Sequence, residues 1–426
     1  MAIRRRTLIA GGLAGTAALA FGVKPGDRGG SHDDYSRQLS KALQVVNLVR
    51  PTLVLDYGRF LANAEQVRKT LIDGPGRLPA RIVVKSLPAV GFMNVLMQVL
   101  QTQRLMVFNM PMLDTVLRNY PDADILFGKP MPVAAVRQWL YTESNRDQLR
   151  NIQWLVDTPV RLQEFVELAN TLKKTLRVSL EIDVGLHRGG FATPKAVKEA
   201  VAFAKENPHI EISGLMGYDA HVGKMPTLFD MQEDAWNACQ QMYKDCVQVL
   251  RDSGLTPEKM TLNSGGSLTY PRHALYTAAN DISLGSAFVM PSDFEKPSLK
   301  AHKPACFIAT PVLKHVDPAL MPGLEWADGL RRWWDPNTEQ GFFIHGGHWL
   351  ADPVSPPGLS LSGLYGQSSN QELYLGSSTM SLQPDDYVFF RPRQSEAVFL
   401  QFGDIAVYNA EKGRIEASWP VFPVSA

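Results

Sequence analysis

Short runs of apolar residues alternate with longer amphipathic stretches from about residue 51 onward. The short β-branched runs predict strands, and the stretches with apolar residues at helical spacing predict helices. The predicted strands lie at residues 53–55, 81–84, 105–108, 125–127, 152–156, 176–182, 210–216, 260–262 and 282–284. Strands alternating with helices predict a parallel sheet, and about eight such units over roughly 250 residues predict a closed (β/α)8 barrel. An open doubly wound sheet is the alternative, but no G-x-G-x-x-G sequence follows the first strand.

The pattern changes after about Cys306, where Pro, Gly, Trp and Asp become frequent and apolar residues alternate with polar ones. Antiparallel strands are predicted at residues 387–390, 397–400 and 404–408. We therefore expect an α/β chain with a TIM-type barrel at residues 36–305 and a C-terminal antiparallel β-domain at residues 306–426, joined by residues 36–50. Helices are predicted at residues 60–71, 93–100, 193–206 and 231–253.

The first 20 residues are typical of an export signal. Arg4, Arg5 and Arg6 precede a weakly apolar run that ends in an A-x-A cleavage site at residues 18–20. The Arg5-Arg6 pair predicts a twin-arginine-type signal peptide at residues 1–20 and a linker at residues 21–35, with an ordinary secretory signal as the alternative. The apolar run is too short to span a bilayer and no Cys follows it, so the mature protein is expected in the periplasm without a membrane anchor, exported by the twin-arginine machinery.

The charge balance and the cysteines exclude several classes of partner and site. The chain has 43 Lys and Arg against 42 Asp and Glu and no basic stripe with interleaved aromatics, which argues against nucleic acid and favours a small substrate. Its three cysteines have no metal-site spacing. Cys239 and Cys246 are seven residues apart in a helical pattern, about 10 Å along the axis, too far for a disulfide within that helix. We therefore expect buried thiols.

Candidate catalytic residues follow the predicted strands, because a parallel barrel carries its chemistry where strands end and loops begin. Lys85 follows the apolar residues 82–84, and apolar surroundings favour the neutral amine, which can form an imine with an aldehyde cofactor. A surface lysine at a strand end is the structural alternative.

Three further clusters carry polar residues in glycine-containing turns. Arg188 lies in residues 181–191 and could bind a ring nitrogen, a carboxylate or a phosphate, or form a structural ion pair. Tyr218 and His221 lie in residues 214–223 and could border a flat ring, although a lone His is more often a packing residue. A glycine loop with hydroxyl donors suits a phosphate; its residues are Ser264, Gly265, Gly266 and Ser267, with Gly285-Ser286 as a weaker candidate.

Taken in order, these motifs resemble the D-threonine aldolase and D-serine dehydratase family, which is related to alanine racemase and shares its fold type III for pyridoxal phosphate (PLP). The segment EIDVGLHRGGF at residues 181–191 is the nearest match, followed by GYDAHVG at 217–223 and NSGGSLT at 263–269. The opening PTLVLD at residues 51–56 and GGHWLADP at 346–353 are also similar. The lysine motif departs from the family, because residues 81–88 read RIVVKSLP without the usual His residues.

The resemblance implies a PLP enzyme for small amino acids that forms a homodimer. Lys85 would hold the cofactor as a Schiff base and move the Cα proton, with Arg188 and His221 as further catalytic residues. The implied cofactor-binding residues are Lys85, Arg188, Tyr218, His221, Ser264, Gly265, Gly266 and Ser267.

One departure concerns a metal ion. Family lyases carry a His followed two residues later by Cys or Asp, whereas the matching stretch here, residues 390–396, reads FRPRQSE. Glu396 alone offers too few ligands, so no metal site is predicted. Three functions stay open: a D-amino-acid lyase or deaminase, an amino-acid racemase or epimerase that needs no metal, and a non-catalytic PLP-binding protein of the periplasm.

Overall fold

The computed structural model describes residues 24–142, 146–226 and 230–423, which form two compact units. Among these residues, the barrel unit comprises those within 55–306, 393–407 and 417–423, and the sheet unit comprises residues 24–54, 307–392 and 408–416. This division differs from the expected one, because residues 393–407 belong with the barrel. The predicted signal peptide lies outside the described residues.

Eight parallel strands close into a barrel in chain order, which confirms the predicted (β/α)8 architecture. They are β2 (Ala80–Val83), β3 (Arg104–Val107), β4 (Asp124–Phe127), β5 (Ile152–Val156), β6 (Leu176–Glu181), β7 (Ile210–Gly217), β8 (Thr261–Ser264) and β9 (Asp281–Leu284). Closure comes from β9 pairing with β2, where Leu284 is opposite Ile82. The first predicted strand is not among them: β1 (Thr52–Asp56) belongs to the second sheet. Its five residues are all buried, and such an apolar run does not encode which sheet will bury it.

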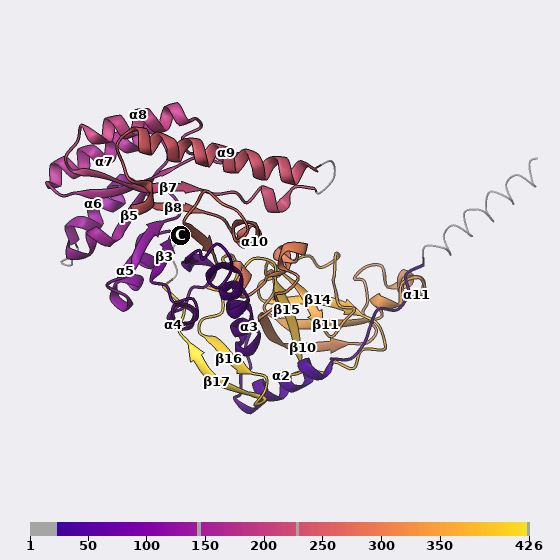
Figure 1. Ribbon diagram of the computed structural model, residues 1–426. Coiled ribbons are helices and arrows are strands. Elements are labelled where there is room, and N and C mark those ends of the chain that lie inside the picture. Colours follow the sequence, from indigo (N-terminus) through magenta and orange to yellow (C-terminus); the bar gives the residue numbers. More distant parts are fainter. Residues whose placement is uncertain (1–23, 143–145, 227–229, 424–426) are drawn as a thin grey trace, which may run out of the picture. The chain divides into compact units, whose positions relative to one another are not determined.

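Helices follow most barrel strands, and Figure 1 shows α7, α8 and α9 along one side of the strands β5 to β8. Thr158 and Thr193 accept hydrogen bonds from backbone amides three residues on, and a proline follows each, so both helices begin at well-defined caps. The helices of this unit are α3 (Tyr57–Val67) with a π-helical extension (Arg68–Ile72), α4 (Val90–Val99), α5 (Met110–Asn119), α6 (Val133–Thr142), α7 (Pro159–Leu172), α8 (Pro194–Lys205), α9 (Met231–Asp252) and α10 (Tyr270–His273).

A buried ion-pair network lies inside the barrel at the start of β2. Arg81 is fully buried and donates to both carboxylate oxygens of Asp281, at 2.8 and 3.0 Å, and to Asp124 at 2.9 Å. A charge this deep is tolerated only when it is paired and hydrogen-bonded. The network ties β2 to β4 and β9, and thereby holds the strand that precedes Lys85.

The second sheet has nine strands, in the order β13-β14-β11-β10-β1-β16-β17, with β15 pairing β10 and β12. Its pairs β10–β11, β11–β14, β10–β15 and β12–β15 are antiparallel, as expected for the C-terminal β-domain. The strands are β10 (Cys306–Val316), β11 (Gln340–His345), β12 (Ala351–Ser355), β13 (Ser360–Leu361), β14 (Gln371–Gly376), β15 (Tyr387–Pro392), β16 (Ile405–Asn409) and β17 (Arg414–Trp419). Helices α2 (Asp34–Val45) and α11 (Asp328–Trp334) belong to the sheet unit.

One predicted C-terminal strand is wrong. Residues 397–400 form a turn, in which the amides of Val398 and Phe399 donate to the carbonyl of Ser395. Both side chains are fully buried, so the apolar run reflects packing of a turn and not a strand.

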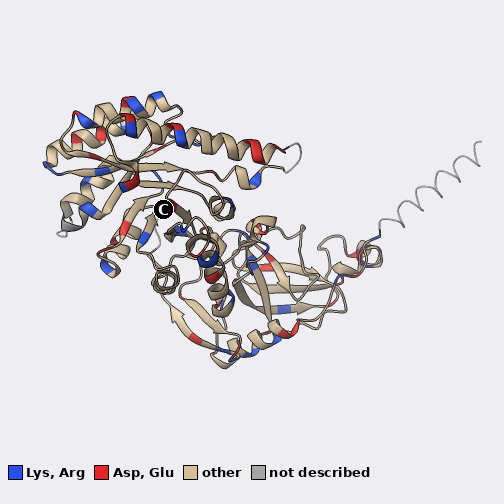
Figure 2. Ribbon diagram, in the orientation of Figure 1, with Lys and Arg blue, Asp and Glu red and all other residues tan. Residues whose placement is uncertain are grey.

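Lys and Arg residues are interspersed with Asp and Glu residues along the outer helices of the barrel (Figure 2). Among the described residues, no helix is both long and apolar enough to cross a membrane.

Candidate functional site

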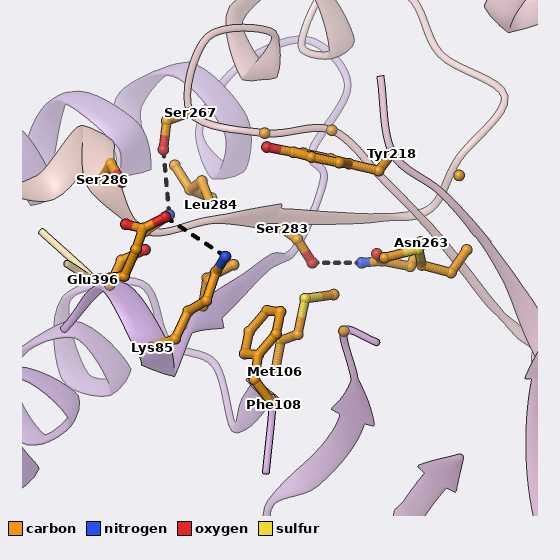
Figure 3. A pocket seen from close by; sticks show the side chains of 18 of the residues that line it. Lys85, Met106, Phe108, Tyr218, Asn263, Ser267, Ser283, Leu284, Ser286 and Glu396 are labelled. Carbon is orange, nitrogen blue, oxygen red and sulfur yellow. Dashed lines mark hydrogen bonds and ion pairs between the residues drawn. The ribbon is translucent and has the colours of Figure 1, made fainter. Parts of the chain in front are cut away.

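Lys85 lies directly after β2, in a short helical turn (Val84–Ser86) at the carboxyl end of the barrel strands. Val84 and Ser86 are buried and hold the turn, while the Lys85 side chain is 38% exposed. Its Nζ lies 4.7 Å from the centre of the Phe108 ring and 3.6 Å from Oε1 of Glu396. Figure 3 shows the Lys85 side chain between these two. The amine therefore faces a cavity, and is not a surface lysine.

This cavity, called the lysine cavity below, is formed within the barrel unit by the ends of several strands. Its empty volume, including the part open to solvent, is about 600 Å³. In Figure 3 the Tyr218 ring lies across the cavity from Met106 and Phe108. Its walls include Lys85, Phe108, Arg188, Tyr218, Asn263, Gly265, Gly266, Ser267, Gly285, Ser286 and Glu396.

Arg188 reaches this cavity from the glycine-rich loop after β6. Its Nη2 donates to Oε1 of Glu181 at 3.1 Å, and the guanidinium lies 4.9 Å from the centre of the Tyr218 ring. Burial raises the pKa of Glu181, and the nearby Arg188 opposes that rise. The loop needs glycine at Gly190, which has a φ of +99° and whose added Cβ would lie 2.9 Å from the Glu181 carbonyl oxygen. Glu181 therefore orients Arg188 beside Tyr218.

The glycine loop after β8 forms another wall. A Cβ added at Gly266 would lie 3.1 Å from Cε2 of Tyr218, so glycine lets the loop backbone approach that ring closely. The Ser267 hydroxyl oxygen accepts from the amide of Ala287 at 3.0 Å, which joins this loop to the turn after β9. Ser264 behaves differently: it is buried, donates to the Gly217 carbonyl at 2.7 Å, and is not among the cavity walls.

His221 also lies away from the lysine cavity. Its Nε2 is 3.5 Å from Sγ of Cys239, and burial lowers the pKa of His221. The structure thus brings together Lys85, Arg188, Tyr218, Gly265, Gly266 and Ser267, together with the weaker candidate Gly285-Ser286, and leaves Ser264 and His221 outside.

Glu396 is the functional candidate that the sequence analysis weighed only as a metal ligand. It directly precedes residues 397–400, which were predicted to be a strand and form a turn, and the approach of residues 393–407 to the barrel has no local sequence signal. Among the residues that the structure describes, no group of three or more His, Cys, Asp or Glu side chains is arranged to hold a metal ion.

The lysine cavity fits the implied PLP. The amine of Lys85 points into it, and aromatic side chains lie on two sides of it. Glycine at 266 and 285 lets the backbone approach Tyr218 and Ser86, which an added Cβ would meet at 3.1 and 2.8 Å. Backbone groups of the glycine loop and the hydroxyls of Ser267 and Ser286 are donors of the kind that bind a phosphate.

Solved structures with the same fold include D-threonine aldolase from Filomicrobium marinum, at a TM-score of 0.69 and 14% identity over 87% of this chain and 95% of that chain. D-threo-3-hydroxyaspartate dehydratase from Delftia sp. HT23 has a TM-score of 0.66 and 14% identity over 87% and 97% of the chains. Alanine racemase from Bacillus anthracis has a TM-score of 0.65 and 12% identity over 87% and 98%. At these identities the likeness establishes the fold.

A search of curated proteins finds no match. The family described as alanine racemase, N-terminal domain, matches residues 55–292, which include every wall of the lysine cavity except Phe294 and Glu396. Since this match covers 238 of the 426 residues, the chain belongs to the alanine racemase N-terminal domain family.

Proposed function

We propose that this protein is a PLP-dependent enzyme acting on small amino acids, with Lys85 as the covalent attachment point. The observation that carries the proposal is the amine of Lys85 at the carboxyl end of a parallel barrel, facing a cavity with an aromatic wall and a glycine loop. Such a cavity is where barrel enzymes place their chemistry.

The residues around the cavity would have different roles. PLP, when bound, withdraws electrons from the bonds at the Cα of an amino acid. Lys85 would bind it and would move the Cα proton, and Gly265, Gly266 and Ser267 would hold its phosphate. Arg188, kept in place by Glu181, and Tyr218 would hold the cofactor between the walls of the cavity and limit the access of water to it.

The finer activity that we propose is that of a D-amino-acid lyase or deaminase. Its support is the similarity in fold to proteins described as a D-threonine aldolase and a D-threo-3-hydroxyaspartate dehydratase. The second candidate is a racemase or epimerase. It is favoured by the family match and by the lack of a metal-binding group of side chains in the described residues, because removal of the Cα proton needs no ion.

The test of the cofactor uses the full chain expressed with PLP. We expect a visible absorbance band, and borohydride reduction should attach the cofactor to the peptide that contains Lys85. Lys85→Ala should lose both signals, and Lys303→Ala, a change in a lysine outside the cavity, should keep them. A wild type that stays colourless with added PLP would refute the proposal.

Product analysis then separates the candidate activities. Single D- and L-amino acids converted to keto acids or aldehydes support the lyase, and exchange between enantiomers supports the racemase. A coloured protein without turnover supports a non-catalytic PLP-binding protein instead.

We also propose that the mature protein is a periplasmic homodimer. An obligate dimer of this kind should bury more than about 2,000 Å². Light scattering at micromolar concentration should give twice the mass of one chain, and a monodisperse monomer would contradict the proposal.

A further inference from the structure

Glu396 reaches the lysine cavity from a turn outside the barrel strands. The turn is held by hydrogen bonds from Val398 and Phe399 to Ser395 and by stacking of Phe399 on Phe92 of α4, with ring centres 6.3 Å apart. Both apolar side chains are fully buried. The Glu396 carboxylate is 33% exposed and points toward Lys85 (Figure 3).

A second cavity within the barrel unit, called the side cavity below, adjoins the first. Its empty volume, including the part open to solvent, is about 710 Å³. The two cavities share walls formed by Tyr218, Gly266, Ser267, Phe294 and Glu396. Glu396 therefore lies where a ligand in the lysine cavity would extend into the side cavity.

Besides Glu396, the charged residues that line the side cavity are Asp293 and Lys224. Asp293 accepts from Gln394 at 3.0 Å and pairs with Arg393 at 3.4 Å, so its charge is already engaged. Lys224 lines the side cavity but is exposed to solvent. The Glu396 carboxylate lies 3.6 Å from the Lys85 amine. The Ser395 hydroxyl donates to the other oxygen of this carboxylate at 3.3 Å.

Resting on the proposed function, we propose that the side cavity receives the substrate side chain and that Glu396 selects amino acids with a basic side chain. A substrate amine that replaces the Lys85 nitrogen places its Cβ and Cγ within about 2.5 to 4 Å of that position. The carboxylate lies at a similar distance, 3.6 Å, from the same nitrogen. A side chain that extends past Glu396 into the side cavity can bring an ammonium to this carboxylate, whereas a side-chain carboxylate meets a like charge.

The test measures binding to the PLP-loaded full chain through the change in visible absorbance of the cofactor, which needs no turnover. The ligands are ornithine, norvaline and glutamate, each as D and L forms, because they have similar lengths and different charges. We expect ornithine to bind about tenfold more tightly than norvaline, and glutamate to bind least tightly. Glu396→Gln should bring ornithine and norvaline to within about twofold of each other.

Glu411→Gln is the matched control, because Glu411 is exposed and lines neither cavity. It should keep the preference for ornithine, and an unchanged melting temperature of Glu396→Gln would show that the turn is intact. Equal binding of glutamate and ornithine by the wild type, or a preference that survives in Glu396→Gln, would overturn this inference and leave the proposed function standing. A protein that never binds PLP would overturn both.

Discussion

Asp219 is expected to stabilise the glycine loop after β8 through its contacts with Thr269 and His273. It directly follows Tyr218 and is 1% exposed. One carboxylate oxygen accepts from the Thr269 hydroxyl at 2.7 Å, and the other lies 2.7 Å from Nε2 of His273. Thr269 and His273 follow the loop at 264–267, so Asp219 connects the Tyr218 wall to the proposed phosphate-binding loop.

Replacing Asp219 by Ala removes both interactions at once. Each hydrogen bond to a charged group contributes about 1.5 to 3 kcal/mol, so the free energy of unfolding should fall by at least about 3 kcal/mol. PLP should also bind less tightly, because the loop loses its attachment to β7. Asp219→Asn keeps an acceptor for Thr269 and should lose about half as much stability.

Urea unfolding of the full chain, followed by fluorescence, measures the loss of stability, and equilibrium titration with PLP measures the loss of affinity. Asp404→Ala is the control, because Asp404 is exposed and should change stability by less than about 0.5 kcal/mol. An Asp219→Ala protein as stable as this control would refute the structural role. A destabilised variant with unchanged PLP affinity would refute the link to the cofactor loop.

Burial lowers the pKa of His302 to about 4 from 6.5, so the unfolded chain binds a proton more readily than the folded chain. The free energy of unfolding should therefore fall by about 2 kcal/mol between pH 7 and pH 5. In His302→Gln the free energy of unfolding should fall by less over the same pH range. Urea unfolding measures both, and equal losses in the two proteins would contradict the prediction. Replacing Arg5 and Arg6 by Lys should leave unprocessed precursor in the cytoplasm, and unchanged processing would indicate the general secretory route. Chelator treatment should change neither PLP binding nor activity. Stoichiometric zinc or manganese, with activity lost to chelator and restored by metal, would point to His345, His348 or Asp352 as ligands.

The sequence by itself determined the barrel and much of its site. The eight strands and the helices between them follow from local periodicity, which each segment carries within a few residues. The glycine loops at 185–190 and 265–266 were also predicted from local sequence, because glycines follow a predicted strand in each, and Gly185, Gly189, Gly190 and Gly265 have positive φ in the structure. Lys85, Arg188 and Tyr218 were found because each follows a strand, and strand ends in a parallel barrel meet on one face.

Tertiary structure alone decided which sheet β1 joins, because its apolar run would be buried equally well in either. It also decided that Ser264 bonds to Gly217 and that His221 lies beside Cys239, since the direction of a side chain after a strand depends on its neighbours in space. The position of Glu396 at the lysine cavity could not be predicted from the sequence. It depends on packing of Phe399 against Phe92, residues more than 300 positions apart, and no local pattern encodes a contact over that separation.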